Sequence, residues 1–245
     1  QRTQQSLTFE NKTPTEIATE IAQDLDIPIE TSSAIEETIE FIGMNNEYPI
    51  LFLMRLSRKL GYDLYVDTSD ADQHKLFFGI NAAPRALALE WGKSLIQFTP
   101  VLKLKDLKEK VIVRGWNPLE SGANRAIVGE AVWSDLNIEM PDSKLLEQLE
   151  FAAENATEEI SEQPVSSEQA ATELAKAALR KIVQQVITGS GSTLGSAGLR
   201  AGIKVELSGL GNRYSADYLI TESTHKLDQS GYTTSFSARM EIVNG

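Results

Sequence analysis

The sequence predicts a mixed α+β fold in two parts, a compact α/β unit up to about Leu87 and a strand-dominated part after it. Three observations indicate this arrangement. Helical and strand patterns alternate in the first third, strand patterns prevail beyond Leu87, and the chain closes on three consecutive strand-like runs. A chain of 245 residues with 41% hydrophobic residues is long enough to bury a core of this kind.

The first expected helix begins at a capping box. Thr13 is its N-cap, Pro14 occupies the first helical position, and Glu16 returns a hydrogen bond to the cap. Pro28 limits the helix on its C-terminal side. One apolar stripe follows at four-residue spacing and consists of Ile17, Ile21 and Leu25.

A second helix is expected from about Tyr48 to Leu60, with Asn46 as its cap and Gly61 as its end. Its predicted buried side consists of Phe52, Leu53, Leu56 and Leu60.

Two strands are then expected at residues 62–66 and 75–78. The acidic, turn-prone residues 67–72 between them indicate an exposed hairpin loop.

Three further strands are expected at residues 95–104, 110–116 and 125–133. The second carries apolar residues on both faces, which indicates burial on both sides near one end. Pro118 stops this strand because proline cannot donate to a β-ladder, and Gly129 is interpreted as a bulge in the third strand.

Residues 142–163 are acidic and irregular, and we interpret them as an insertion that holds at most a short helix before a solvated connection at 154–162. Another capping box then begins a long helix at about 167–187. Its four-residue repeat consists of Leu174, Ala178, Ile182 and Val186. The Gly/Ser-rich run 189–198 is expected to be a flexible turn.

The last three strands are expected at residues 204–207, 218–225 and 232–242, separated by turns at 209–212 and 228–231. This pattern predicts a β-meander. Apolar and polar residues alternate along its first strand, so one face is buried and the other is polar. No cluster of catalytic residue types occurs in it, and we interpret the segment as a wall.

Composition excludes several classes of protein. The chain has no Cys, so disulfides, thiolate metal sites and cysteine nucleophiles are excluded. A formal charge of −12 disfavours nucleic-acid binding, which depends on Lys and Arg displacing counterions. No window reaches the roughly 18 apolar residues of a membrane helix. The first residues include neither an initiator Met nor a signal-peptide core, and we interpret the chain as an internal piece of a longer protein.

The candidates for chemistry are weak. His74 and His225 lack the spacing of metal ligands, so structural or surface roles are expected for both. The run 189–192 follows a helix and has no Lys, unlike a phosphate-binding loop, and no Gly-x-Ser-x-Gly elbow occurs. Several acidic pairs lie in polar stretches that would not separate their pKa values, namely Glu36 with Glu37, Asp70 with Asp72, and Glu158 with Glu159. We expect no catalytic residue, no metal and no cofactor.

The three tryptophans, Trp91, Trp116 and Trp133, lie in strand patterns. A sugar-stacking platform is one interpretation, but packing in the core or at an interface is favoured at such positions. Together with Arg114 they are our candidates for interface residues.

Four segments occur in an informative order. They are SLTFENKT at residues 6–13, FLMRLSRKLGYDL at 52–64, VRGWNP at 113–118, and the closing meander at 199–242. In this order they resemble the phage late-control gene D family. That family comprises the baseplate hub proteins of contractile tails, together with VgrG-like relatives in type VI secretion spikes and in extracellular contractile injection systems.

The resemblance implies a homotrimeric hub that links the inner tail tube to the central spike. Residues 1–86 would be the α/β hub domain, and residues 87–245 a tail-tube-like antiparallel β-barrel. That barrel would carry the acidic insertion at about 142–163, with the helix at about 167–187 packed on its outside. A second barrel would precede Gln1, and three subunits would then present a pseudo-sixfold ring.

The resemblance also implies the partners, which are the inner tail-tube protein and the spike protein, with no specific nucleic-acid binding and no integral membrane segment. The location would be a phage virion tail or an injection-particle baseplate, assembled in the bacterial cytoplasm. An acidic channel wall that does not adhere to cargo is compatible with the charge of −12. Two alternatives remain, a cell-envelope glycan hydrolase with two carboxylates about 5–10 Å apart, and a glycan-binding β-module that uses the tryptophans.

Overall fold

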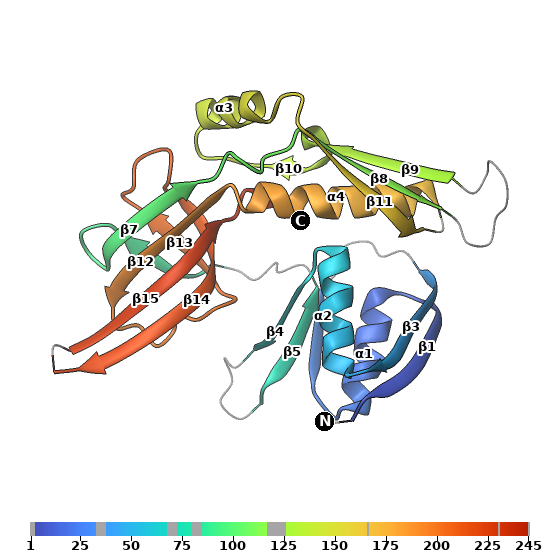
Figure 1. Ribbon diagram of the computed structural model, residues 1–245. Helices are drawn as coiled ribbons and strands as arrows, with labels where there is room; N and C mark the ends of the chain where they lie inside the picture. The colour runs from blue at the N-terminus through green and yellow to red at the C-terminus, as the bar shows by residue number, and fades with distance from the viewer. Residues whose placement is uncertain are drawn as a thin grey trace.

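The computed structural model describes residues 3–32, 38–67, 73–79, 85–116, 126–165, 167–229 and 231–244. Its architecture is mixed α+β, which confirms the predicted fold class. Figure 1 shows an α/β unit below, a curled sheet to the left, and a long helix beneath a smaller sheet at the top.

The α/β unit contains two helices and five strands in the order β1 (Gln5–Lys12), α1 (Pro14–Asp24), β2 (Ile29–Ser32), β3 (Ile39–Glu47), α2 (Pro49–Leu60), β4 (Asp63–Asp67) and β5 (Lys75–Gly79). β4 and β5 pair antiparallel, as the sequence predicts, and β2 joins them in the order β2-β5-β4. β1 and β3 form a separate antiparallel ribbon. The sequence analysis missed β1, β2 and β3. Residues 68–72 of the predicted hairpin loop lie outside the described residues.

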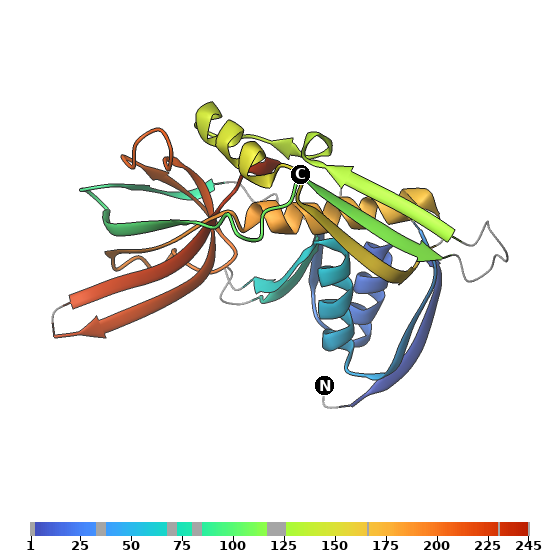
Figure 2. The ribbon, with the colours of Figure 1, turned by 45° about the horizontal axis from the view of Figure 1, so that its top comes forward.

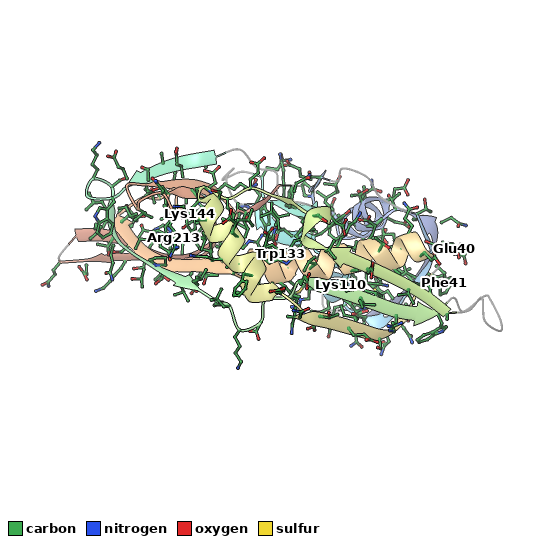
Figure 3. All side chains as sticks on the ribbon, turned by 90° about the horizontal axis from the view of Figure 1, so that it is seen from above. Glu40, Phe41, Lys110, Trp133, Lys144 and Arg213 are labelled. Carbon is green, nitrogen blue, oxygen red and sulfur yellow. The ribbon has the colours of Figure 1, made fainter. Side chains whose placement is uncertain are left out.

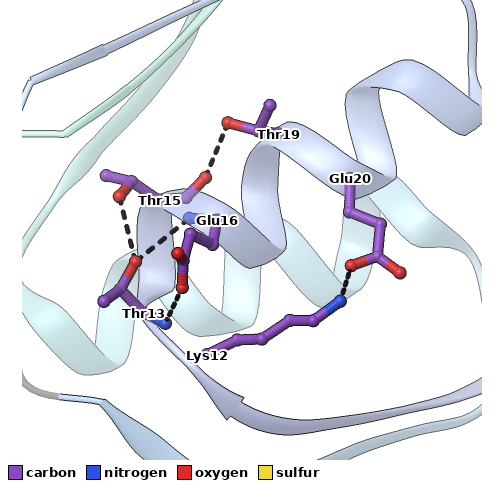
Figure 4. A network of polar contacts seen from close by, with 6 residues as sticks. All are labelled: Lys12, Thr13, Thr15, Glu16, Thr19 and Glu20. Carbon is purple, nitrogen blue, oxygen red and sulfur yellow. Dashed lines mark hydrogen bonds and ion pairs between the residues drawn. The ribbon is translucent and has the colours of Figure 1, made fainter.

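The capping box of α1 is confirmed. The Thr13 backbone N–H donates to Glu16 Oε2 at 2.8 Å, and the Glu16 N–H donates to Thr13 Oγ1 at 3.3 Å (Figure 4). Lys12, the last residue of β1, forms an ion pair with Glu20 on this helix. α1 ends at Asp24 with Leu25 as C-cap, ahead of Pro28.

α2 ends as predicted but begins differently. Gly61 closes the helix in the left-handed conformation at φ 70°, where glycine carries no steric penalty. The expected cap, Asn46, is wrong. Asn46 lies at the end of β3, Tyr48 occupies the N-cap without a side-chain hydrogen bond, and Pro49 begins the helix.

The second part contains two helices, a short 3₁₀ turn and eleven strands in the described residues. They are β6 (Arg85–Glu90), β7 (Leu95–Leu102), β8 (Lys110–Trp116), β9 (Ala126–Val132), η2 (Trp133–Asp135), β10 (Asn137–Ile138), α3 (Ser143–Ala153), β11 (Thr157–Pro164), α4 (Glu168–Gln184), β12 (Ile187–Leu194), β13 (Lys204–Ser208), β14 (Ala216–Asp228), β15 (Gly231–Met240) and β16 (Val243–Asn244).

The largest sheet has six strands in the order β6-β13-β14-β15-β12-β7 and curls into a half-barrel (Figures 1 and 2). The predicted meander β13-β14-β15 is confirmed. β6 and β7 end the sheet on its two sides. They approach each other at one end only, through an isolated bridge between Trp91 and Leu95.

The Gly/Ser-rich run after the long helix is not a turn, so that expectation is wrong. It forms β12, which pairs with β15 on one side and with β7 on the other. Its glycines make room for aromatic rings. A Cβ on Gly189 would lie 2.4 Å from Phe98 Cζ, and one on Gly191 would lie 2.6 Å from Phe236 Cζ.

A second sheet, in the order β11-β8-β9, corrects two expectations. Residues 154–162 are not a solvated connection, because β11 pairs parallel with β8 from Thr157 onward. The long helix α4 does not pack on the outside of the half-barrel. It lies against β8 and β9 of this smaller sheet.

Gly129 in β9 is not a bulge, because β8 and β9 pair in continuous register through it. Its role is close packing. A Cβ there would lie 2.3 Å from the backbone nitrogen of Thr172 in α4. Alanines on the same side of the helix, Ala171 and Ala175, are fully buried.

The apolar core falls into two clusters. One lies in the α/β unit and is centred on Phe9, Ile17, Phe52 and Phe78. The other extends from Leu89 to Val243 and joins the half-barrel, α3, α4 and the smaller sheet. In the described part of the chain, no helix is long and apolar enough to span a membrane.

Candidate interface surfaces

The four interface candidates do not form one patch. Trp116 is half-buried and Arg114 exposed, and both lie on β8. Trp91 is 47% exposed at the end of β6, on the other sheet. Trp133 is buried, with its Nε1–H donating to the Lys108 carbonyl at 2.6 Å, so most of its ring packs within this chain.

The face of the smaller sheet that points away from α4 carries paired charges. Arg114 Nε donates to Glu159 Oε1 at 2.7 Å, and Lys110 Nζ lies 3.7 Å from Glu130 Oε2. Val128, opposite Arg114 in the ladder, is 45% exposed. A face of balanced charges with isolated apolar side chains is typical of the rim of an interface.

Trp91 marks the place where the ends of the half-barrel meet. Its backbone N–H donates to the Ser208 carbonyl at 2.9 Å, and the Gly92 N–H donates to the Leu95 carbonyl at 3.2 Å. Gly209 packs closely on it, since a Cβ there would lie 3.0 Å from Trp91 Cβ. The backbone of Trp91 is therefore fixed where β6 leads into β7.

The sequence analysis missed several exposed apolar side chains. They are Phe41 on β3, Ile96 and Val101 on β7, Phe151 on α3, Leu194 on β12, and Leu227 on β14. Phe41 lies at the opposite end of the molecule from Arg213 in Figure 3. Strand periodicity indicates that one face is apolar, but it does not say which apolar residues a neighbouring element leaves uncovered.

The outer face of the half-barrel carries rows of small hydroxyl groups. A shallow hollow of about 330 Å³ lies there, lined in part by Ser190, Ser192, Thr224, Ser235 and Ser237. These side chains lie opposite one another across β12, β15 and β14. Gln97 and the carboxylate of Glu222 also line the hollow, so the face is polar and carries at least one negative charge.

The remaining candidates for chemistry are dispersed. His74 is exposed just before β5. His225 Nδ1 lies 2.9 Å from the Tyr232 hydroxyl and 3.1 Å from Thr234 Oγ1, near the tip of the β14–β15 hairpin. Both histidines are therefore exposed, and His225 takes part in a local hydrogen-bond network.

The acidic pairs give no catalytic dyad in the described residues. Glu158 Oε2 lies 3.7 Å from Lys108 Nζ, while Glu159 pairs with Arg114. The two adjacent carboxylates therefore form ion pairs with different basic side chains. The pairs 36–37 and 70 with 72 lie outside the described residues. Within the described ranges, no three His, Cys, Asp or Glu side chains gather as a metal site would require.

Two tyrosines have raised pKa values. Burial raises the pKa of Tyr65 to about 12, with the carboxylates of Asp67, Asp63 and Glu30 adding to the effect. Burial also raises the pKa of Tyr218, whose hydroxyl donates to the Tyr214 carbonyl at 3.0 Å. Both phenols stay protonated at neutral pH and act as packing and hydrogen-bonding groups.

The family model described as phage tail baseplate hub (GPD) matches residues 1–231. The chain belongs to the phage tail baseplate hub family. This confirms the resemblance seen in the sequence. Among curated proteins, none matches the chain.

Solved structures share the fold of this hub family member. A 43 kDa tail protein of a Shewanella oneidensis prophage is 16% identical with a TM-score of 0.67, over 94% of this chain and 66% of that one. A tail protein of Neisseria meningitidis is 10% identical with a TM-score of 0.67, over 98% and 70%. A component of the Escherichia coli type VI secretion system is 14% identical with a TM-score of 0.57, over 98% and 52%. The hub chain thus spans from about half to 70% of the length of these three proteins.

Proposed function

We propose that the chain is a structural, non-enzymatic subunit of the baseplate hub in a contractile tail or injection system, where it links the inner tail tube to the central spike as a homotrimer. Family membership supports the hub role. The division into an α/β hub domain at 1–86 and a tube-like domain at 87–245 belongs to this proposal. The two core clusters support that division.

The observation that carries the proposal is the incomplete closure of the half-barrel. Among the residues that the structure describes, β6 pairs only with β13, and β7 pairs only with β12, apart from the single bridge at Trp91. An uncovered strand edge presents unpaired N–H and C=O groups, which proteins normally cover. A ring of copies covers such edges because each edge meets the next subunit.

Exposed apolar side chains on β7 support the same use of this edge. Ile96 is 52% exposed and Val101 is 45% exposed. The charge of −12 fits a channel that passes cargo without holding it, because an acidic wall repels nucleic acid. Interface roles for Trp91, Arg114 and Trp116 remain part of this proposal.

The test combines native mass spectrometry with electron microscopy of the chain mixed with the inner tail-tube protein of the same particle. We expect a trimer bound to one end of the tube. The double variant Ile96→Lys, Val101→Lys should remain folded by circular dichroism but fail to assemble. Phe151→Lys, which exchanges one exposed apolar side chain on α3 for a lysine, is the control away from β7 and should assemble normally.

Assembly of the Ile96→Lys, Val101→Lys variant at wild-type yield would contradict the use of the β7 edge. A turbidity assay on purified peptidoglycan addresses the hydrolase alternative. Clearing of the suspension by the wild-type chain would overturn the non-enzymatic assignment.

A further inference from the structure

Within the described ranges, a short stretch of the α/β unit makes several contacts with the rest of the molecule. Three residues of that stretch, Gly61, Asp63 and Tyr65, meet Ala177, Arg239 and Gly202 respectively. Among the described residues, the main contact between a helix or strand of the α/β unit and one of the second part is that of α2 with α4, and it is small. The two core clusters remain separate across this junction. A small contact of this kind permits relative motion of two units.

The first contact joins two small residues, one from each part. Gly61 sits at the end of α2, and a Cβ on it would lie 3.4 Å from Ala177 Cβ on α4. A glycine and an alanine touch here without interlocking.

The second contact is also made against a glycine. The Tyr65 ring lies 3.4 Å from the position that a Cβ on Gly202 would occupy. Tyr65 stacks on Phe77 of its own unit, with ring centroids 4.8 Å apart. Gly202 is held in the other part, where its N–H donates to the Ile220 carbonyl at 2.8 Å. Each residue is therefore secured within its own unit.

The third contact is an ion pair with a second partner at hand. Arg239 Nη2 lies 3.8 Å from Asp63 Oδ2, while Arg239 Nε donates to Glu241 Oε1 at 3.2 Å. Glu241 also forms an ion pair with Lys204, whose Nζ lies 3.5 Å from Glu241 Oε2. The Arg239 side chain is only 15% exposed, so losing all partners would leave a nearly buried charge. Glu241 prevents this, because it pairs with Arg239 whether or not Asp63 is present.

We propose that the α/β unit pivots on the Gly61–Ala177 and Tyr65–Gly202 contacts, and that the Asp63–Arg239 ion pair is the latch that holds one orientation. When the latch opens, the Asp63 carboxylate, whose side chain is 32% exposed, is reached by water, and Arg239 keeps Glu241. Both states are therefore electrostatically satisfied. A hub subunit with such a joint adjusts its α/β unit to its neighbours during assembly.

The test measures a distance across the junction in the whole chain. Because the sequence has no Cys, spin labels attach only at introduced sites, Asp24→Cys at the end of α1 and Thr224→Cys on β14. Both positions are exposed. Pulsed electron–electron double resonance then reports the distribution of distances between the two units.

The Asp63→Asn variant opens the latch and leaves Arg239 with Glu241. The Asp63–Arg239 pair is long, at 3.8 Å, and Arg239 keeps Glu241, so we expect its loss to cost about as little as that of a surface pair and the population of the open orientation to grow by about two- to five-fold. In wild type, 1 M salt should have the same effect, because it shortens the screening length to about 3 Å. Glu47→Gln is the matched control, since it removes the Arg55–Glu47 ion pair inside the α/β unit. It should leave the distribution unchanged.

A disulfide provides an independent lock. A Cβ placed on Gly61 would lie 3.4 Å from Ala177 Cβ, close to the separation found in disulfides, about 3.5–4.5 Å. A Cys at φ 70° strains the backbone in the oxidised and the reduced chain alike, so the comparison of the two forms isolates the effect of the disulfide. Oxidised Gly61→Cys, Ala177→Cys chain should show a small-angle scattering profile that salt does not alter, whereas the reduced form of the same variant should respond as wild type does. A single narrow distance distribution in wild type, Asp63→Asn and 1 M salt alike would overturn the pivot.

Discussion

Single glycines decide several close approaches in this molecule. Gly129 lets α4 lie directly on β9, and Gly189 and Gly191 admit two phenyl rings to the inner side of the half-barrel. In the sequence these glycines indicated a bulge and a flexible turn. The physical reason for their presence is an element far away in the sequence, so the local pattern could not reveal it.

Replacing Gly129 by Ala should destabilise the chain. The added Cβ would lie 2.3 Å from the Thr172 backbone nitrogen, so α4 must move away from the sheet. We expect a loss of about 1–3 kcal/mol in the free energy of unfolding, measured by urea denaturation. Gly43→Ala is the matched control on β3, because a Cβ there meets no atom within 4 Å. Equal stability of the two variants would contradict the packing role.

Tyr65 should give the chain an alkaline sensitivity. Its pKa is raised to about 12 in the folded state, against about 10 in an unfolded chain. A raised pKa contributes stability that is complete below the unfolded value and is lost as the pH rises toward the folded value. We therefore expect the free energy of unfolding to fall less between about pH 10 and 12 in Tyr65→Phe than in wild type.

Chemical denaturation at several pH values measures this slope, and absorbance at 295 nm follows the phenolate directly. Tyr232→Phe, which removes an exposed tyrosine, is the control. Identical slopes for wild type and Tyr65→Phe would show that Tyr65 titrates normally.

At the scale of elements, helices were more predictable than strands. α1 was found from Thr13, Pro14 and Glu16 because a capping box is complete within four residues. α4 begins where expected, with the Ser167 Oγ accepting the Ala170 N–H at 3.0 Å, but the expected capping box is wrong because Ala170 stands at the position that would need Glu or Gln. Its packing partner was not predicted either. β11 pairs with β8 although a helix and some forty residues separate them in the chain. The acidic sequence of β11 contains no local pattern that predicts this pairing.

The capping box of α1 predicts a measurable contribution. Thr13→Ala removes the oxygen that accepts the Glu16 N–H, so we expect a loss of about 1 kcal/mol in unfolding free energy. Thr13→Ser keeps the oxygen and should stay close to wild type. Urea denaturation compares the three proteins. A Ser variant as unstable as the Ala variant would assign the effect to the lost methyl group instead.

At the scale of the whole molecule, the two core clusters predict two unfolding units. Phe52 is fully buried in the first cluster, with its ring centroid 5.7 Å from that of Phe9. Phe52→Ala should destabilise the α/β unit by about 3–5 kcal/mol. The half-barrel and α4 should keep their wild-type protection, because their cluster does not include this ring.

Hydrogen exchange with mass spectrometry resolves the two units peptide by peptide. Phe236→Ala, in the second cluster, is the reciprocal control and should lower protection only beyond residue 85. Simultaneous loss of protection in both parts of either variant would show that they unfold as one.

The sequence by itself determined the α+β class, the capped helices, the closing meander and, through four ordered segments, the hub family. Each of these depends on residues close together in the chain or on an order of motifs. The tertiary structure alone decided that the Gly/Ser run is a strand, that the acidic segment completes a second sheet, and that Trp133 is buried while Trp91 is exposed. It also brought Asp63 to Arg239. These outcomes depend on pairings between distant segments, whose free energy comes from burial and hydrogen bonding that no short window of sequence contains.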